Sequence, residues 1–132
     1  MRLMDATDPD FTQFWSERAL SSLTTIRPDG TPHVVPVGVT VDPAAGTAWV
    51  ITSGTSQKAR LVAAAGGDGL AAAACQVDGR RWSTLEGRAF LRDDPATVAE
   101  AVRRYALRYK QPRENPRRVV LEIVVSRVLG NV

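Results

Sequence analysis

The sequence predicts an α+β barrel in which six strands, joined mainly as antiparallel hairpins, carry three helices at the ends and flank. Several short runs alternate apolar with polar residues, as strands with one buried face do. Turn-type sequences separate most of these runs, and the remaining segments have helical spacing behind a capping residue. With 132 residues, 44% of them hydrophobic, the chain fits a single domain over residues 1–132 with one core.

A helix over residues 8–20 is expected first, because Pro9 suits a first turn and apolar side chains recur behind it at helical spacing. Strands are expected to follow over residues 20–26, 32–41 and 47–52, with turns at 27–31 and 42–46 between them. In the second of these strands, alternation places Pro36, Gly38 and Thr40 on the face opposite His33 and the valines that alternate with them.

The second half is expected to contain a helix over 56–65 and then strands over 70–77 and 81–91. A longer helix runs from Asp94-Pro95 to about Lys110, and a final strand covers 118–128. The apolar stripe of the longer helix contains Val98, Ala101, Val102, Tyr105 and Tyr109. Its basic side contains Arg103, Arg104, Arg108 and Lys110.

Composition excludes several classes of protein. The net charge of +3 and the pI of about 9.6 suit an anionic small molecule as well as nucleic acid, and no nucleic-acid-binding motif is present. One cysteine and one histidine cannot form a zinc or haem site, so no metal is expected. Cys75 lies in an alanine-rich run and is interpreted as a buried structural thiol. The lone cysteine, and the absence of a membrane-spanning stretch or signal peptide, predict a cytoplasmic protein.

The most informative segment is the predicted helix start at residues 53–62. Thr55 or Ser56 can cap this helix, which places Lys58 in its first turn, where unpaired N–H groups already favour negative charge. A cation is mildly unfavourable there unless an anion binds between it and the N–H groups. The segment alone therefore fits an ordinary capped helix with a solvated lysine as well as a phosphate site.

Two further segments could contribute to a site. Pro36 and Gly38 form a strip of small residues along which a flat ring could lie, although a β-bulge or a protected edge strand would use the same residues. Residues 75–82 combine an amide, two guanidinium groups and an indole around a tight turn, which suits an aromatic anion, although viewed alone the run favours a solvated turn beside a core tryptophan. Arg117 and Arg118 begin a strand, so one can face a ligand and the other the surface. No Rossmann or Walker sequence is present, and the collection is typical of a surface that binds a cofactor.

These segments resemble the split β-barrel flavin and deazaflavin oxidoreductases, the superfamily of pyridoxamine phosphate oxidase. The resemblance covers about residues 14–130, and the matching stretches include 32–40, 50–59, 76–82, 85–89, 108–113 and 115–120. Within the superfamily, the stretches 76–82 and 115–120 resemble the F420-dependent biliverdin reductases most closely. The resemblance implies a six-stranded antiparallel split barrel with flanking helices that forms a homodimer, with two equivalent sites at the interface.

The resemblance also implies which residues bind. The cofactor-binding residues would be Pro36, Val37, Gly38, Val39, Thr52, Ser53, Ser56, Gln57, Lys58, Ala59, Gln76, Trp82, Arg117 and Arg118. The substrate-binding residues would be Arg80, Arg81 and Arg88, which could pair with carboxylates of a tetrapyrrole. The residues around 76–82 and Arg117-Arg118 would come from the partner subunit. No catalytic residue is assigned.

The implied activity is hydride transfer from reduced coenzyme F420 to an unsaturated acceptor, with biliverdin and its product bilirubin as the favoured pair. FMN is the alternative cofactor, because both cofactors are phosphorylated tricycles that a Lys58 site would accept. A carrier that binds the cofactor or a tetrapyrrole without turnover is an alternative of a different class. A structural or nucleic-acid-binding dimer is a third, and it would show steep salt dependence and no cofactor affinity.

Overall fold

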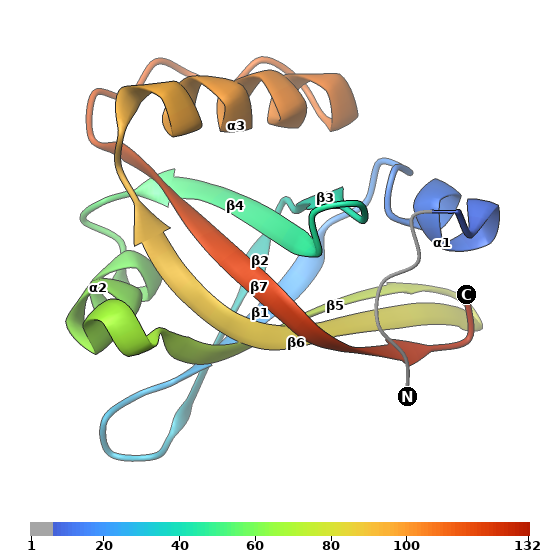
Figure 1. The fold of residues 1–132 in the computed structure, drawn as a ribbon, viewed down its shortest axis with the longest axis horizontal. Coiled ribbons are helices and arrows are strands. Elements are labelled where there is room, and N and C mark those ends of the chain that lie inside the picture. Colours follow the sequence, from blue (N-terminus) through green and yellow to red (C-terminus); the bar gives the residue numbers. More distant parts are fainter. Residues whose placement is uncertain (1–6) are drawn as a thin grey trace.

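The computed structural model describes residues 7–132, and its chain forms a strongly curved sheet with helices around it (Figure 1). The elements in chain order are α1 (Pro9–Phe14), β1 (Ser21–Ile26), β2 (Pro32–Val37), β3 (Thr40–Asp42), β4 (Thr47–Ser53), α2 (Gln57–Ala65), a 3-10 turn η1 (Gly66–Asp68), β5 (Leu70–Asp78), β6 (Arg81–Arg92), α3 (Pro95–Arg108) and β7 (Arg118–Gly130). The strands lie in the order β2-β1-β5-β6-β7-β4-β3, and every pair is antiparallel.

The prediction of six strands is wrong by one, because the strand expected over 32–41 is divided at Gly38-Val39. The N–H of Val39 donates to the Tyr109 hydroxyl at 3.1 Å, and its carbonyl accepts from Arg108 at 2.5 Å. The backbone of Val39 therefore forms hydrogen bonds with the side chains of Arg108, the last residue of α3, and Tyr109, the residue after it, and not with a neighbouring strand. As a result β2 pairs with β1, β3 pairs with β4, and the two edge strands of the sheet are consecutive in the chain.

The first helix is shorter than expected and ends at Phe14, not near residue 20. Its start is as predicted, since Pro9 opens the helix and the Asp8 carboxylate accepts from the N–H groups of Asp10 and Phe11. Beyond Phe14 the carbonyls of Glu17 and Ala19 accept from the side chains of Arg108 and Tyr109. The chain turns at residues 15–18, and these tertiary hydrogen bonds hold the non-helical segment that leads from there into β1.

The core lies inside the curved sheet, where Leu23, Val50, Leu85, Leu121 and Ile123 are each at most 1% exposed. A bulge at Glu86-Gly87 bends β6 against β7. A Cβ on Gly87 would lie 2.0 Å from the Val124 carbonyl oxygen, so only glycine allows the two strands this close approach. Cys75 is half-buried and not fully buried as expected.

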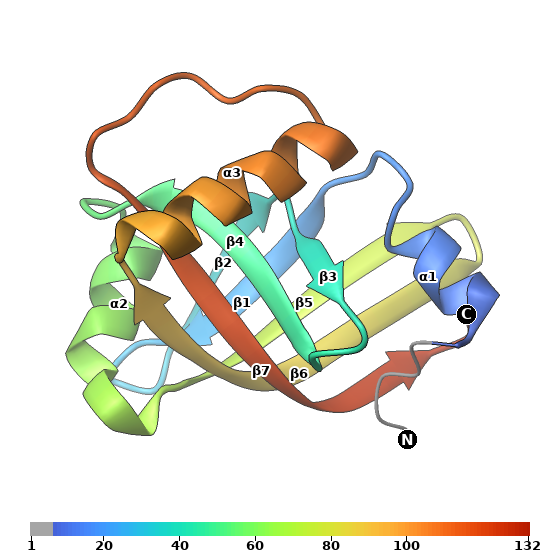
Figure 2. The same cartoon turned by 45° about the horizontal axis from the view of Figure 1, so that its top comes forward.

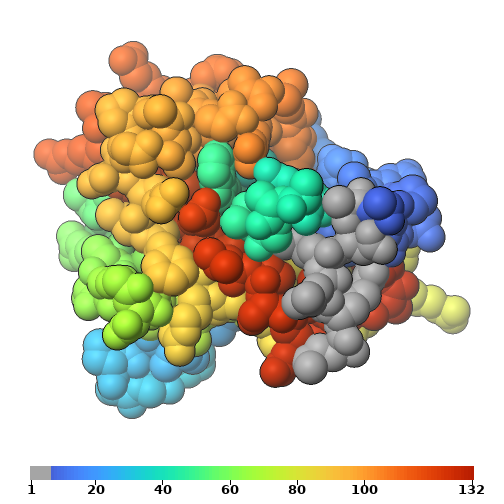
Figure 3. Space-filling model, viewed as in Figure 1, coloured from blue at the N-terminus to red at the C-terminus, as the bar shows by residue number. Residues whose placement is uncertain are grey.

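The helices cover the ends and one side of the sheet, as predicted (Figures 1 and 2). The α2 helix stands at one end, and the turn between β5 and β6 lies at the other (Figure 1). The α3 helix crosses one side, and residues 109–117 arch back from its end to the start of β7 (Figure 2). In the space-filling view α3 forms a continuous ridge, and the β1–β2 hairpin projects below α2 (Figure 3). No helix in the described part of the chain is long and apolar enough to cross a membrane.

Candidate functional site

A cavity of about 340 Å³ opens where β2, β4, α2 and α3 approach one another beneath the segment 109–117. It is lined by Leu20, Pro36, Val37, Gly38, Ile51, Thr52, Ser53, Lys58, Tyr105, Pro112, Asn115 and Arg118. These residues come from five separate stretches of sequence, which the antiparallel pairing of β1 with β2 and of β4 with β7 brings together. The volume is in the range of cavities that hold a small molecule or cofactor.

The corner between β4 and α2 supplies the polar end of this cavity. Ser56 caps α2 by accepting the Ala59 N–H at 3.2 Å, and it also accepts a hydrogen bond from the Thr52 hydroxyl at 2.9 Å. The cap places Lys58 in the first turn, as predicted, and its side chain lines the cavity. This corner is built from hydroxyl groups and helix N–H groups, which favour an anion.

Lys58 carries a charge that nothing else in the described chain neutralises. It is half-buried, and within residues 7–132 its ammonium makes neither a hydrogen bond nor an ion pair. Burial lowers the pKa of Lys58 below the ordinary value for lysine, since desolvation disfavours the charged form. A bound phosphate would restore the interactions that the ammonium has lost to burial.

The segment before β7 supplies a second cation. Arg118 lines the cavity and is held by a hydrogen bond from its Nη2 to the Arg113 carbonyl at 2.5 Å. The Asn115 side chain accepts the Arg117 N–H at 2.9 Å and fixes the turn that leads into the strand. Arg117 is exposed and does not line the cavity, so the two arginines face different surroundings, as the alternation predicted.

The floor of the cavity depends on the absence of a side chain at Gly38. A Cβ there would lie 2.8 Å from Cε2 of Tyr105 and 3.0 Å from Cε2 of Tyr109. The two tyrosine rings pack against each other with centroids 4.8 Å apart. Of the two rings only that of Tyr105 lines the cavity, and with Pro36 and Gly38 it forms an apolar side next to the polar corner, against which a ring could pack.

Arg108 fixes this floor from behind. Its guanidinium donates to the carbonyls of Glu17 and Val39 and to the side chain of Gln76. Burial lowers the pKa of Arg108, but the three acceptors compensate the buried charge. The prediction that Arg108 belongs to a basic side of α3 is therefore wrong, because this guanidinium points into the protein.

Seven of the predicted cofactor-binding residues meet in the cavity, namely Pro36, Val37, Gly38, Thr52, Ser53, Lys58 and Arg118. Four others lie next to it in sequence but do not line it. Of these, Val39 and Ala59 are fully buried, Ser56 is occupied as the helix cap, and Gln57 is exposed.

The structure places the remaining predicted residues elsewhere. Gln76 is fully buried, and its amide donates to the Phe14 carbonyl at 2.9 Å while it accepts from Arg108. Because both ends of the amide are used internally, Gln76 supports the site from below and does not face it. Arg80, Arg81 and Trp82 lie at the turn between β5 and β6, at the opposite end of the sheet from α2 (Figure 1). Arg81 there pairs with Glu17 at 2.9 Å and with Asp78.

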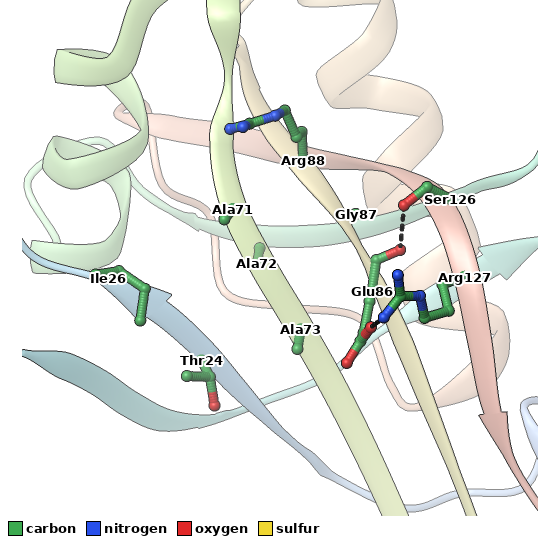
Figure 4. Close-up of a pocket in the computed structure, with 10 residues that line it drawn as sticks. All are labelled: Thr24, Ile26, Ala71, Ala72, Ala73, Glu86, Gly87, Arg88, Ser126 and Arg127. Carbon is green, nitrogen blue, oxygen red and sulfur yellow. Dashed lines mark hydrogen bonds and ion pairs between the residues drawn. The ribbon is translucent and has the colours of Figure 1, made fainter. Parts of the chain in front are cut away.

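Arg88 lies on a different surface, a shallow hollow of about 410 Å³ on the outer face of β1, β5, β6 and β7 (Figure 4). Ala71, Ala72 and Ala73 form its floor, and Glu86 pairs with Arg127 at 3.5 Å across it. The Arg88 side chain extends over β5, away from that pair, and contacts the Gly69 carbonyl at 3.4 Å (Figure 4). This hollow differs from the cavity that contains Lys58 and Arg118, because its floor consists of alanines and two of its charges, those of Glu86 and Arg127, are paired.

Five cavity residues were not predicted, namely Leu20, Ile51, Tyr105, Pro112 and Asn115. Tyr105 was placed on the apolar stripe of α3, which is correct, but the stripe gave no indication that a ring would reach a cavity. Asn115 lies two residues before the predicted Arg117. Asparagine is common in turns, and this preference was the one sequence signal that could have indicated its position.

The fold and the cavity define a split-barrel protein with a small cavity lined by two cations, and sequence comparison identifies the family. The chain belongs to the pyridoxamine 5'-phosphate oxidase family, whose model matches residues 7–131. It is 53% identical over 122 residues to the F420H2-dependent biliverdin reductase of Mycobacterium tuberculosis, an alignment that covers 92% of this chain and 86% of that protein.

Solved structures share the fold at lower identity. A conserved hypothetical protein from Mycobacterium tuberculosis superposes with a TM-score of 0.78 and 21% identity, covering 98% of this chain and 89% of the other. A protein described as an F420 reductase superposes with a TM-score of 0.70 and 23% identity, covering 89% of this chain and 94% of the other. These two similarities support the fold alone.

Proposed function

We propose that this protein is an F420-dependent oxidoreductase that passes a hydride from the reduced deazaflavin to a conjugated acceptor, and that the acceptor is biliverdin. The observation that carries the proposal is the 53% identity, over 92% of the chain, to an F420H2-dependent biliverdin reductase. The cavity supports it independently, because the small residues Pro36 and Gly38 line it together with two cations, Lys58 and Arg118.

The residues of the cavity have distinct roles in this proposal. Lys58 and Arg118 bind the phosphate of the cofactor, and the hydroxyl groups of Thr52 and Ser53 lie beside them. Pro36, Val37 and Gly38 present the surface against which the ring lies. Reduced F420, when bound, supplies the hydride. The protein contributes orientation and the exclusion of water, since holding two planar systems in contact accounts for a large part of such a rate.

We further propose that the protein is a homodimer with sites at its interface. Arg80, Arg81 and Trp82 are exposed at the turn between β5 and β6 and do not line the cavity of their own chain, which is consistent with their approaching a site from a second copy. The outer hollow with its alanine floor offers a surface on which β-sheets of two copies can pack closely. In the dimer, Trp82 and Arg117 would complete the cofactor site, and Arg80, Arg81 and Arg88 the acceptor site.

Parallel titrations test the cofactor and the acceptor. Purified protein is titrated with F420 and with FMN, with tryptophan fluorescence as the readout, and biliverdin is then added to the complex with reduced F420. We expect tight F420 binding, oxidation of the deazaflavin and the appearance of bilirubin. A preference for FMN would move the protein to the flavin-dependent branch, and binding without turnover would identify a carrier or another acceptor.

A further inference from the structure

A second hollow adjoins the cofactor cavity at Leu20 and Tyr105, which line both. It measures about 370 Å³ and is lined by Arg18, Ala19, Leu20, Tyr105, Tyr109 and Lys110. It lies where the end of α3 meets the segment between α1 and β1 (Figure 2). The two hollows therefore form one trough, with Lys58 and Arg118 in one part and Arg18 and Lys110 in the other.

The backbone holds Arg18 and Lys110 at this second position. The carbonyls on either side of Arg18, those of Glu17 and Ala19, accept from Arg108 at 2.9 Å and from the Tyr109 hydroxyl at 2.7 Å. Lys110 directly follows these two donors in the chain. The same hydrogen bonds that end α1 early thus fix both cations beside one hollow.

Neither cation has a partner in the described part of the chain. The side chains of Arg18 and Lys110 are exposed and make no hydrogen bond or ion pair among residues 7–132. The neighbouring carboxylate, that of Glu17, already pairs with Arg81 at 2.9 Å. Two like charges held in one hollow repel each other, and an anion between them would relieve that repulsion.

The rim beside these cations is apolar. Leu20 is 62% exposed and Val34 is 57% exposed, and a third, shallow hollow lined by these two residues and Pro36 joins the trough at Leu20. A flat conjugated molecule with carboxylate groups would match both the apolar rim and the two cations of this part of the trough. Biliverdin is such a molecule, because it carries two propionates on a conjugated tetrapyrrole.

We propose that Arg18 and Lys110 bind the carboxylates of the acceptor and so determine how the acceptor lies beside the cofactor. This inference rests on the proposed function and goes beyond it, since it assigns the acceptor's acidic groups to one chain's own cations and not to Arg80, Arg81 or Arg88. The carboxylates of the cofactor's glutamate tail have the same chemistry, and the test separates the two sources.

The test compares the double variant Arg18→Gln/Lys110→Gln with the control Arg60→Gln/Arg103→Gln, which removes the same charge from exposed positions outside the trough. The dissociation constants of biliverdin and of its dimethyl ester are measured by absorbance titration without cofactor, and that of F420 by fluorescence. We expect the double variant to bind biliverdin about tenfold to a hundredfold more weakly, as the loss of one or two charge-assisted contacts predicts. Binding of the ester and of F420 should not change, and the control should match the original protein.

Three results would overturn the inference. Unchanged biliverdin affinity would exclude a role for these cations, and an equal loss for the ester would show that the variant has damaged the trough. A loss confined to F420 with a long glutamate tail would assign the cations to the cofactor. These outcomes are distinct from failure of the proposed function, which would appear as absence of F420-dependent biliverdin reduction by the unmodified protein.

Discussion

Lys58 is charged in a place that disfavours charge, and this has a definite consequence for pH dependence. Its pKa in the folded chain lies below the value in the unfolded chain because of desolvation. Between these two pKa values the unfolded state binds more protons, so the free protein gains stability as pH rises through that alkaline window. A bound phosphate would oppose this effect, because its negative charge favours the protonated ammonium of Lys58.

Replacement of Lys58 by methionine tests this residue directly. We expect the variant to bind F420 about tenfold more weakly, because it loses a charge-assisted phosphate contact worth about 1.5–3 kcal/mol. Without ligand it should be no less stable than the original protein at neutral pH, since the desolvated charge is gone. Isothermal titration and thermal unfolding measure the two quantities. Arg60→Met, at an exposed position on the same helix, is the control, and equal F420 affinity in both variants would contradict the anion site.

Substitution of Gly38 by alanine tests the floor of the cavity. The new Cβ would lie 2.8 Å from the Tyr105 ring and 3.0 Å from the Tyr109 ring. Tyr109 cannot easily move away, because its hydroxyl bonds to Val39 and Ala19. We expect a loss of about 1–3 kcal/mol in the free energy of unfolding, as for other overpacked sites, together with weaker F420 binding.

Chemical denaturation of Gly38→Ala and of Gly38→Ala/Tyr105→Ala separates overpacking from other effects. Removal of the Tyr105 ring should make the alanine less costly than it is in the original background. If the cost of Gly38→Ala is the same in both backgrounds, contact with Tyr105 is not its cause.

At the scale of elements, the end of α3 holds three separate segments together through Arg108. Replacement by methionine would leave the Glu17 carbonyl and the side-chain oxygen of Gln76 without this donor, and the Val39 carbonyl with only a 3.4 Å hydrogen bond from the Tyr109 hydroxyl. Since an unsatisfied buried acceptor costs about 1–3 kcal/mol, we expect the largest loss of stability among the single arginine variants of this helix. Arg103→Met should leave stability almost unchanged, because its pair with Glu100 is exposed to solvent. Urea unfolding of both variants provides the comparison.

Local signals predicted the starts and the sequence of the elements well. Ser56, one of the two predicted candidates, and Asp94 cap their helices, and Pro9 lies in the first turn of α1 as predicted. The ends and interruptions were missed where the determining contact is distant in sequence. The division of the strand at Val39 depends on Arg108 and Tyr109, which lie about seventy residues further along. Periodicity places these two side chains on a face of α3 but does not show which carbonyl they meet.

The residues of the site likewise divide into those with a local sequence signal and those whose position depends on contacts distant in sequence. Lys58, Pro36 and Gly38 were predicted because each is unusual within its own element, and all three line the cavity. Gln76 is equally unusual as a polar residue in an apolar strand, but its partners, Phe14 and Arg108, come from elsewhere and satisfy it inside the protein. Leu20 gave no signal, since its place beside the cavity arises only when α3 fixes the segment before β1.

At the scale of the whole molecule, a substitution on the outer face of the sheet tests the proposed homodimer. Ala73 lies at one end of the alanine floor, between Thr24 and Glu86 in the neighbouring strands (Figure 4). We expect Ala73→Arg to convert a dimer into a monomer without loss of secondary structure, because the side chain projects outward. Sedimentation velocity and circular dichroism measure the two properties. Ala64→Arg, at an exposed position on α2, should remain dimeric, and identical sedimentation of the two variants would place the interface elsewhere.

The hydrogen bond between Val39 and Tyr109 has a further consequence, for hydrogen exchange. Most protected amides of a sheet exchange when their own strands separate, but the Val39 amide donates to a side chain that follows α3. Its exchange rate therefore reports the local detachment of the end of α3 and not the opening of the sheet. This one amide provides an internal probe of whether the floor of the cavity is assembled, and its protection should increase when a ligand rests on that floor.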